Sequence, residues 1–187
     1  MSAEYCLKTE PVTLDSAEGQ AKELLQSAKQ SLGFVPNMYA GMARLPGVLS
    51  TYLHGYEQFR ASSGLTPTEQ EVIFLVVSRE NGCGYCTAAH SMLADQMSGV
   101  PADVLEAVRQ NKPIPDQRLA ALAEFVKVMF DSRGKPSQAD VKTFLDAGFA
   151  ESHILAVVLA LAVKTLSNYS NHVGQPEIDQ AFAEYKL

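Results

Sequence analysis

Apolar residues recur along this chain with the spacing of helices rather than the alternation of strands. After Pro46, apolar side chains at steps of three and four fall on one side of a helix, namely Leu49, Tyr52, Leu53, Tyr56 and Phe59. The run 72–77 is rich enough in β-branched and aromatic residues to pass for a strand. A helix-start signal precedes it, however, and the uninterrupted segment is about fourteen residues long, which favours a helix. The pattern as a whole predicts an all-α fold.

The clearest helix start is the stretch TPTEQ. Thr66 fits the N-cap, Pro67 the first helical position, and Glu69 completes a capping box. Asn81 and Gly82 are a favourable pair for ending that helix. Similar signals predict further helices at 17–31, 46–59, 83–97, 102–110, 117–133, 138–147 and 151–172, with a last turn or two within 177–185. The caps expected for three of them are Asp15 or Ser16, Asp116 and Ser137.

Length and composition limit the class of protein. The 187 residues suit a single domain spanning 1–187, with an N-terminal arm at 1–15. The net charge is −6 and no run of Lys or Arg alternates with aromatic residues, so we expect no nucleic-acid partner. The longest apolar run, 154–163, is shorter than the roughly 20 residues of a membrane span, and we expect a buried core helix and no membrane association. Three cysteines without an export signal favour a reducing, cytoplasmic compartment.

The chemistry of the chain is concentrated in NGCGYCTAAH, residues 81–90. Cys83 and Cys86 lie three residues apart at the predicted start of a helix, where Gly84 allows the tightening that a disulfide needs. The helix N-terminus favours thiolate over thiol, most strongly for Cys83. His90, four residues after Cys86, lies on the same face and can take a proton from its thiol. Two thiols and a base predict dithiol–disulfide chemistry.

Other interpretations of these residues compete with a redox centre. The two cysteines could bind zinc, but a structural zinc site needs about four ligands and no second CxxC or HxxxH follows. They could also be inert core residues, and the histidine could be an ordinary buried one. We therefore expect no metal at this site.

The stretch GCGYCTAAH, preceded by TPTEQEVIFL, resembles the motif of the alkylhydroperoxidase D and carboxymuconolactone decarboxylase family. In the redox branch of that family a glutamate lies twelve residues before a CxxC, and a histidine lies four residues after it. Glu71, Cys83, Cys86 and His90 occupy these positions. The segments LGFVPNMYAGMARLPGVL and NYSNHVGQPEID resemble the family's peroxidase-related members as well, so the resemblance covers about 32–179.

The resemblance implies an AhpD-like helical bundle with its redox core at about 46–110. It also implies a homo-oligomer (dimer, trimer or hexamer) and reduction of alkyl hydroperoxides without haem, flavin, metal or any other cofactor. Cys86 would attack the peroxide and become a sulfenic acid, and Cys83 would condense with it to a disulfide that a thiol or dithiol reductant protein reopens. The best-known members carry a second histidine just before the second cysteine, where this chain has Tyr85. Helix-end electrostatics alone would favour Cys83 as the first nucleophile.

Several residues outside the cysteine motif are candidates for the same site. A carboxylate such as Glu71 within an apolar helix is costly unless it is paired or exposed; the motif spacing indicates that it orients His90. Asn168, Asn171 and His172 form a polar cluster at the end of the last long helix, and we expect that end to reach solvent rather than line a pocket. The cluster is the best secondary site candidate.

Two other functions remain open at the level of sequence. One is a lyase like the carboxymuconolactone branch, whose chemistry does not need the intact CxxC. The other is a non-catalytic helical oligomer in which the dithiol is a redox sensor or a metal-binding switch. A peroxidatic thiol would be acidic, whereas a structural pair would titrate near or above the value of a free thiol.

Overall fold

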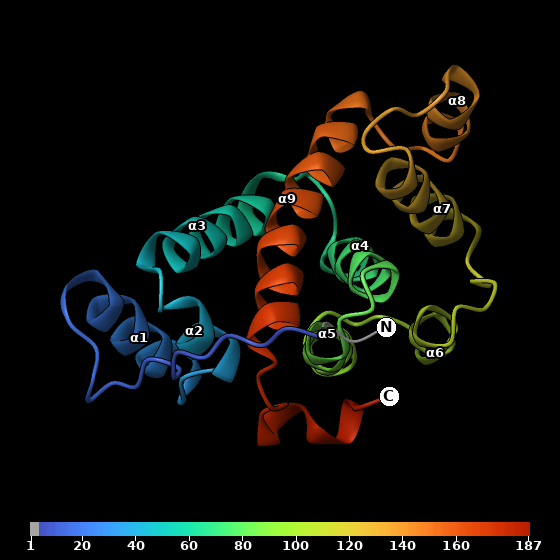
Figure 1. Ribbon diagram of the computed structural model, residues 1–187. Coiled ribbons are helices and arrows are strands. Elements are labelled where there is room, and N and C mark those ends of the chain that lie inside the picture. Colours follow the sequence, from blue (N-terminus) through green and yellow to red (C-terminus); the bar gives the residue numbers. More distant parts are fainter. Residues whose placement is uncertain (1–3) are drawn as a thin grey trace.

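The computed structural model describes residues 4–187 and contains only helices and loops in that range, which confirms the all-α prediction (Figure 1). The part of the predicted arm at 1–3 lies outside the described residues. The α-helices are α1 (Gly19–Leu32), α2 (Asn37–Met42), α3 (Pro46–Ser62), α4 (Pro67–Glu80), α5 (Gly84–Gln96), α6 (Ala102–Arg109), α7 (Gln117–Asp131), α8 (Gln138–Asp146) and α9 (Glu151–Gly174). A 3-10 helix, η1 (Gln180–Tyr185), follows them.

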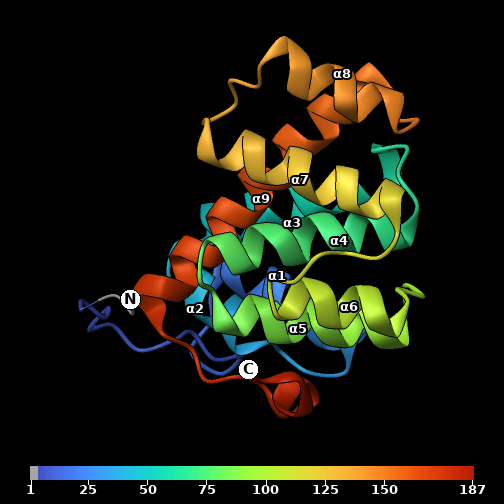
Figure 2. The same ribbon diagram turned by 90° about the vertical axis from the view of Figure 1, so that its right-hand side faces the viewer.

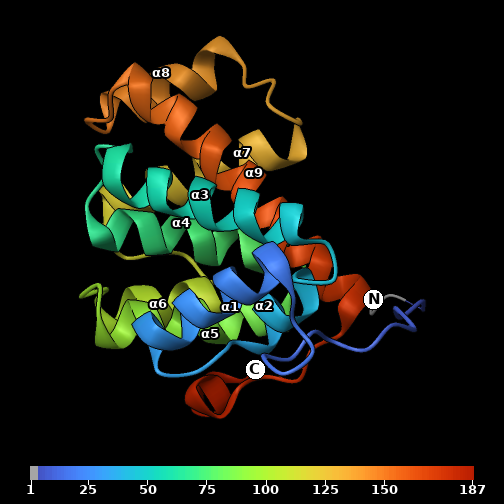
Figure 3. The same cartoon turned by 90° about the vertical axis from the view of Figure 1, so that its left-hand side faces the viewer.

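Helices α3, α4 and α9 form the centre of the fold. Helix α9 crosses the middle of the molecule and contacts α2, α3, α4, α5 and α7 (Figure 1). Viewed from the side, α7 and α8 lie above the layer of α3 and α4, and α5 and α6 lie below it, with η1 at the lower edge (Figure 2). From the opposite side, α1 and α2 are nearest the viewer, in front of α5 (Figure 3). The core of each layer is therefore closed by helices that are distant in sequence.

Helix α4 is buried on almost every side, which explains its strand-like composition. All residues from Glu69 to Ser78 are buried, and a helix that is apolar around its whole circumference is typical of a protein interior. Its predicted start is confirmed, because the Thr66 side chain accepts from the Glu69 backbone N–H and the Glu69 side chain accepts from the Thr66 N–H. Asn81 and Gly82 end it, with Gly82 at φ 67°.

Helix α9 is long and apolar enough, by length and composition, to cross a membrane, with 39% of its most apolar window buried. A core helix of this kind passes the same test, and α9 packs one face against five other helices. Its opposite face exposes four large apolar side chains: Leu155, Val158, Tyr169 and Val173.

The predicted start of α1 is wrong. The helix begins at Gly19, two residues late, and Glu18 is its N-cap without a side-chain hydrogen bond. Ser16 does not cap it, because its hydroxyl and that of Thr13 bond each other in a local turn. Serine side chains offer the backbone such turns as an alternative to a helix cap.

Candidate active site

Both cysteines of the CxxC lie at the beginning of α5 and point into the protein. Cys83 is the N-cap residue and Cys86 lies in the first turn. Each is only 2% exposed, and both are free thiols. The left-handed backbone of Gly82 makes the sharp turn between α4 and α5. This turn brings the first turn of α5 against the end of α4.

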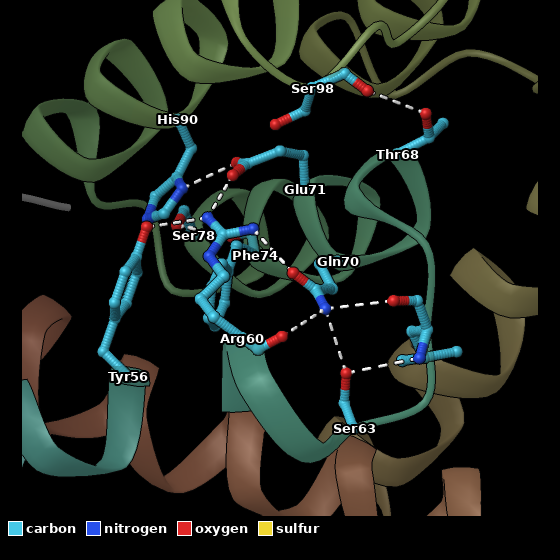
Figure 4. A network of polar contacts seen from close by, with 11 residues as sticks. Tyr56, Arg60, Ser63, Thr68, Gln70, Glu71, Phe74, Ser78, His90 and Ser98 are labelled. Atoms are coloured by element: carbon cyan, nitrogen blue, oxygen red, sulfur yellow. Dashed lines mark hydrogen bonds and ion pairs between the residues drawn. The ribbon is translucent and has the colours of Figure 1, made fainter. Parts of the chain in front are cut away.

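The buried carboxylate of Glu71 reaches His90 from the neighbouring helix. Glu71 on α4 is 0% exposed and His90 on α5 is 4% exposed. The Nδ1 atom of His90 lies 2.8 Å from Oε2 of Glu71 (Figure 4). Because a carboxylate only accepts, Nδ1 carries the proton, and in the neutral ring Nε2 is left as the acceptor. The arrangement fixes the tautomer that a general base requires.

Arg60 on α3 holds the other oxygen of Glu71 (Figure 4). Its guanidinium donates to Oε1 of Glu71, to the Tyr56 hydroxyl at 2.7 Å and to Oε1 of Gln70 at 3.1 Å. The Gln70 amide in turn donates to Ser63 Oγ and two backbone carbonyls. The carboxylate is therefore held by a hydrogen-bonded network that spans α3, α4 and α5.

Helix α9 supplies the contacts to the sulfur atoms. Nδ2 of Asn171 lies 3.3 Å from Sγ of Cys86 and 3.6 Å from Sγ of Cys83. Lys164, two turns earlier on the same helix, is 1% exposed. The predicted solvent exposure of the polar cluster is thus wrong for Asn171 and Asn168, both of which are buried.

The end of α9 is covered because other segments pack over it. The backbone N–H of Leu7 donates to the Val173 carbonyl, which places the N-terminal arm along this end of the helix. Asn168 is turned toward the end of α4, where Oδ1 accepts from Asn81 Nδ2 at 2.9 Å. His172 is half-buried and stacks on Tyr169, on a different side of the helix from the sulfur contact of Asn171. Asn168 and His172, the secondary candidates on α9, thus do not share one site.

The two thiols have opposite electrostatic environments. For Cys86, burial opposes ionisation, but the hydrogen bond from Cys83, the Lys164 ammonium, His90 and Ser167 outweigh it and lower the pKa well below its usual value. For Cys83, the hydrogen bond to Cys86 and then burial raise the pKa. Cys86 is therefore the thiolate and Cys83 the thiol that donates to it. A full charge nearby outweighs the partial charge of the helix end, which by itself favours Cys83.

Glu71 and His90 also have shifted pKa values. Burial raises the pKa of Glu71, but His90 and Arg60 outweigh it, so the pKa lies below the ordinary value. Burial and then the Lys164 charge lower the pKa of His90, and Glu71 only partly offsets them. Glu71 is thus a carboxylate beside a neutral imidazole, which is the form that accepts a proton.

A cavity of about 400 Å³ opens beside Cys86 and His90, which both line it. Its wall is largely aromatic, and six rings contribute: Phe34, Tyr39, Tyr52, Tyr56, Tyr85 and Phe182. Mostly apolar walls with a few converging polar groups are typical of small-molecule sites. Cys83 does not belong to this wall, so a molecule in the cavity meets Cys86 first.

Tyr85 lines this cavity. It lies where the best-known members of the family that the sequence resembles carry a second histidine. Its hydroxyl donates to Oδ2 of Asp179 and accepts from the Met38 backbone N–H at 3.3 Å. Its ring packs edge-on against Phe182 of η1. Burial and then Asp179 raise the pKa of Tyr85, so it remains neutral. Tyr85 therefore joins the C-terminal segment to α5.

Three contributors were not predicted from the sequence as site residues: Arg60, Lys164 and Ser167. Lys164 had a detectable signal, because it is the lone charge at the end of the apolar run ILAVVLALAVK and shares a helical face with Asn168 and Asn171. Arg60 had none, since an arginine in the last turn of a helix is most often a solvated, dipole-favoured residue. Across residues 4–187, no three His, Cys, Asp or Glu side chains cluster as a metal site would require.

The fold and the site define an all-α protein with a buried, asymmetric dithiol at a helix N-terminus. Residues 46–127, which contain Glu71, both cysteines and His90, match the sequence model of the carboxymuconolactone decarboxylase family. The match confirms the resemblance inferred from the sequence. Among curated protein sequences, none matches this chain.

Solved structures share the fold over nearly the whole chain. The AhpD-core, peroxidase-related protein from Ralstonia eutropha JMP134 is 21% identical with a TM-score of 0.82, covering 94% of this chain and 93% of its own. A peroxidase-related protein from Silicibacter sp. TM1040 is 22% identical with a TM-score of 0.76, and 95% of each chain is covered. A variant of the debrominase Bmp8 in complex with 2,3,4-tribromopyrrole is 16% identical with a TM-score of 0.76, covering 98% of this chain and 97% of its own. The AhpD-like fold is therefore confirmed.

Proposed function

We propose that this protein is a CxxC-dependent peroxidase that reduces organic hydroperoxides with the dithiol of Cys83 and Cys86. The observation that carries the proposal is the buried Glu71–His90 hydrogen bond beside a cavity whose wall includes Cys86. A thiolate, an oriented neutral base and an apolar chamber are the groups that peroxide reduction by a thiol requires.

In the first step, the Cys86 thiolate is the nucleophile, and His90 Nε2 takes the proton of the terminal oxygen of the hydroperoxide. The thiolate attacks the terminal oxygen of the hydroperoxide, the S–O bond forms and the O–O bond breaks. The leaving alkoxide receives the proton held by His90 and departs as the alcohol. Cys86 is now a sulfenate, two electrons more oxidised than the thiolate, and a proton from water converts it to the sulfenic acid.

In the second step, the Cys83 thiol condenses with the Cys86 sulfenic acid, releasing water and forming the disulfide. Cys83 is suited to this role because it stays protonated until the sulfenic acid forms, and it already lies against the Cys86 sulfur. Two equivalents of an external thiol, or one dithiol reductant protein, then restore the pair and leave as the disulfide.

Single cysteine variants test the proposal. With an organic hydroperoxide and dithiothreitol, Cys86→Ser is expected to abolish turnover. Cys83→Ser is expected to turn over more slowly and, when dithiothreitol is left out, to stop after one oxidation, with a sulfenic acid on Cys86 that a dimedone-type reagent traps and mass spectrometry locates. Cys6→Ser is the matched control, since Cys6 lies in the N-terminal arm, and it should keep the parental rate. Unchanged turnover in both Cys83→Ser and Cys86→Ser would refute the proposed function.

A second candidate function uses the same dithiol for reductive dehalogenation. It is favoured by the aromatic lining of the cavity, which suits a flat halogenated ring. One carbon–bromine bond and two thiols would give a carbon–hydrogen bond, one disulfide and hydrogen bromide. Bromide release from 2,3,4-tribromopyrrole, measured beside the hydroperoxide assay, decides between the two substrates.

We further propose that the protein forms a homo-oligomer. The face of α9 that exposes Leu155, Val158, Tyr169 and Val173 supports this, because exposed apolar patches commonly mark interfaces. Light scattering on the purified protein gives the mass; a monomer at micromolar concentration would contradict the proposal.

A further inference from the structure

Lys164 is a cation buried in the apolar centre of the fold. It is 1% exposed, and its Nζ forms no hydrogen bond with any side chain or backbone group of the described residues. The ammonium lies 5.4 Å from the centroid of the Phe74 ring. Burial of a charge without a partner is strongly unfavourable, and a cation–π contact offsets only a small part of that cost. Lys164 therefore needs a negative charge close by.

The position of Lys164 on α9 places it at the dithiol. Ser167, whose hydroxyl helps to lower the pKa of Cys86, and Asn171, which contacts both sulfurs, follow three and seven residues later on the same face. The Phe74 ring beneath the ammonium packs against the His90 ring, with 4.9 Å between their centroids. The Lys164 charge consequently acts on Cys86 and on His90.

The charges of the buried cluster balance in one protonation state. Glu71 from α4 is already neutralised by Arg60 from α3, and His90 from α5 is neutral. Lys164 from α9 is then the remaining cation, and the dithiol of Cys83 and Cys86 is the remaining group that can supply an anion, which Cys86 carries. If Cys86 were a thiol, the interior would hold one uncompensated positive charge.

We propose that Lys164 is a positioning residue that holds Cys86 as a thiolate and keeps His90 neutral. The proposal rests on the proposed function for its catalytic meaning, but the ion pair it describes exists before any substrate binds. The charge of Lys164 on α9 therefore selects Cys86 as the first nucleophile. It outweighs the effect of the helix N-terminus, which favours Cys83.

The test uses the two neutral variants Lys164→Met and Lys164→Gln in the full chain. Reduced protein is treated with iodoacetamide over a range of pH, and alkylation is followed separately at each cysteine by peptide mass spectrometry. We expect alkylation of Cys86 near neutral pH to be at least about tenfold slower in both variants, with its pH profile moved to higher pH. Lys142→Met, which removes an exposed lysine of α8, is the matched control and should leave the profile unchanged.

Thermal unfolding of the same proteins separates positioning from structure. A lysine that only supports the fold would lower the melting temperature when removed, whereas loss of an ammonium that lacks a hydrogen-bond partner should leave Lys164→Met as stable as the parent or more so. A parental pH profile at Cys86 in either folded variant overturns the proposal, and so does failure of both variants to fold.

The alkylation assay keeps this proposal distinct from the proposed function. Slower alkylation in the neutral variants of a protein that reduces no hydroperoxide would support the ion pair and refute the peroxidase. If the protein is an active peroxidase but its Lys164 variants are alkylated at Cys86 at the parental rate, the proposed function would be supported and the ion pair refuted.

Discussion

Replacing Glu71 by glutamine removes a charge and keeps the shape of the side chain. Glu71 binds Arg60 through one oxygen and His90 Nδ1 through the other, at 2.8 Å. In the variant, the neutral amide no longer fixes the tautomer of His90 or stabilises the imidazolium that forms when His90 takes the proton of the hydroperoxide. A hydrogen bond to a charged group contributes about 1.5–3 kcal/mol. At about 1.4 kcal/mol per tenfold, the rate of peroxide reduction should fall roughly 10- to 150-fold.

The effect of Glu71→Gln on stability should be smaller than burial of the carboxylate suggests. Arg60 loses its anionic partner, but its side chain is 23% exposed and it keeps the Tyr56 hydroxyl and the Gln70 carbonyl as acceptors. We expect a loss of about 1–3 kcal/mol, the cost of a weakened hydrogen bond rather than of a fully buried lone charge. At about 2–4 °C per kcal/mol, the melting temperature should fall by several degrees.

Glu69→Gln is the matched control on the same helix. Glu69 is also buried and is paired with Arg118, but its other bonds complete the capping box at Thr66, at the far end of α4 from the cysteines. We expect this variant to lose stability and to keep its turnover. The measurement is single-turnover oxidation of Cys86 together with thermal unfolding of both variants. If Glu71→Gln oxidised within about twofold of the parental rate while melting earlier, Glu71 would be a structural residue and the relay reasoning would be refuted.

Two other predictions concern stability. The folded-state pKa values of both Glu71 and His90 are lowered, so the unfolded chain binds more protons than the folded one near the ordinary pKa of each group. The free energy of unfolding should therefore fall on acidification, first below the ordinary histidine pKa and again through the carboxylate range. Urea unfolding midpoints measured across pH test this dependence, and a flat profile would contradict it. Gly55→Ala would place a Cβ 2.9 Å from Val163 Cγ2 and should cost about 1–3 kcal/mol, whereas Gly47→Ala in open space on the same helix should be neutral or slightly stabilising; equal melting temperatures would contradict the packing argument.

Local signals in the sequence predicted most of the helices. The capping box at Thr66, the break at Asn81 and Gly82 and the cap at Asp116 all act within a few residues, and the structure has each of them. The start of α1 was missed because the Ser16 hydroxyl bonds Thr13 in a local turn instead of capping the helix. A serine side chain can do either, and sequence spacing does not decide between the turn and the cap.

The site was predictable where its geometry is also local. Cys83, Cys86 and His90 share one helix, so their spacing fixes their common face. The prediction about the end of α9 failed because solvent exposure there depends on the N-terminal arm, whose Leu7 pairs with Val173. The contact of Asn171 with the sulfurs joins residues 85 and 88 positions apart, and no periodicity encodes it.

The difference between local and long-range contacts also explains why the sequence and the structure favour different cysteines as the first nucleophile. Helix position alone selects Cys83, which is indeed the N-cap residue. The charge that lowers the pKa of Cys86 comes from Lys164, on another helix. A sequence argument that includes only the nearest backbone dipole omits the larger, tertiary term.

In the proposed peroxidase cycle, burial of the two sulfurs sets different size limits for the oxidant and for the reductant. A hydroperoxide that fits the cavity of about 400 Å³ would bind beside Cys86 and leave as a smaller alcohol. The reductant must instead carry a sulfur atom inward to a disulfide between residues that are each 2% exposed. A small thiol or a flexible cysteine-bearing segment can reach the buried disulfide, whereas a broad, rigid protein surface cannot. The shape of the reductant would then limit the rate of dithiol regeneration rather than the rate of peroxide consumption.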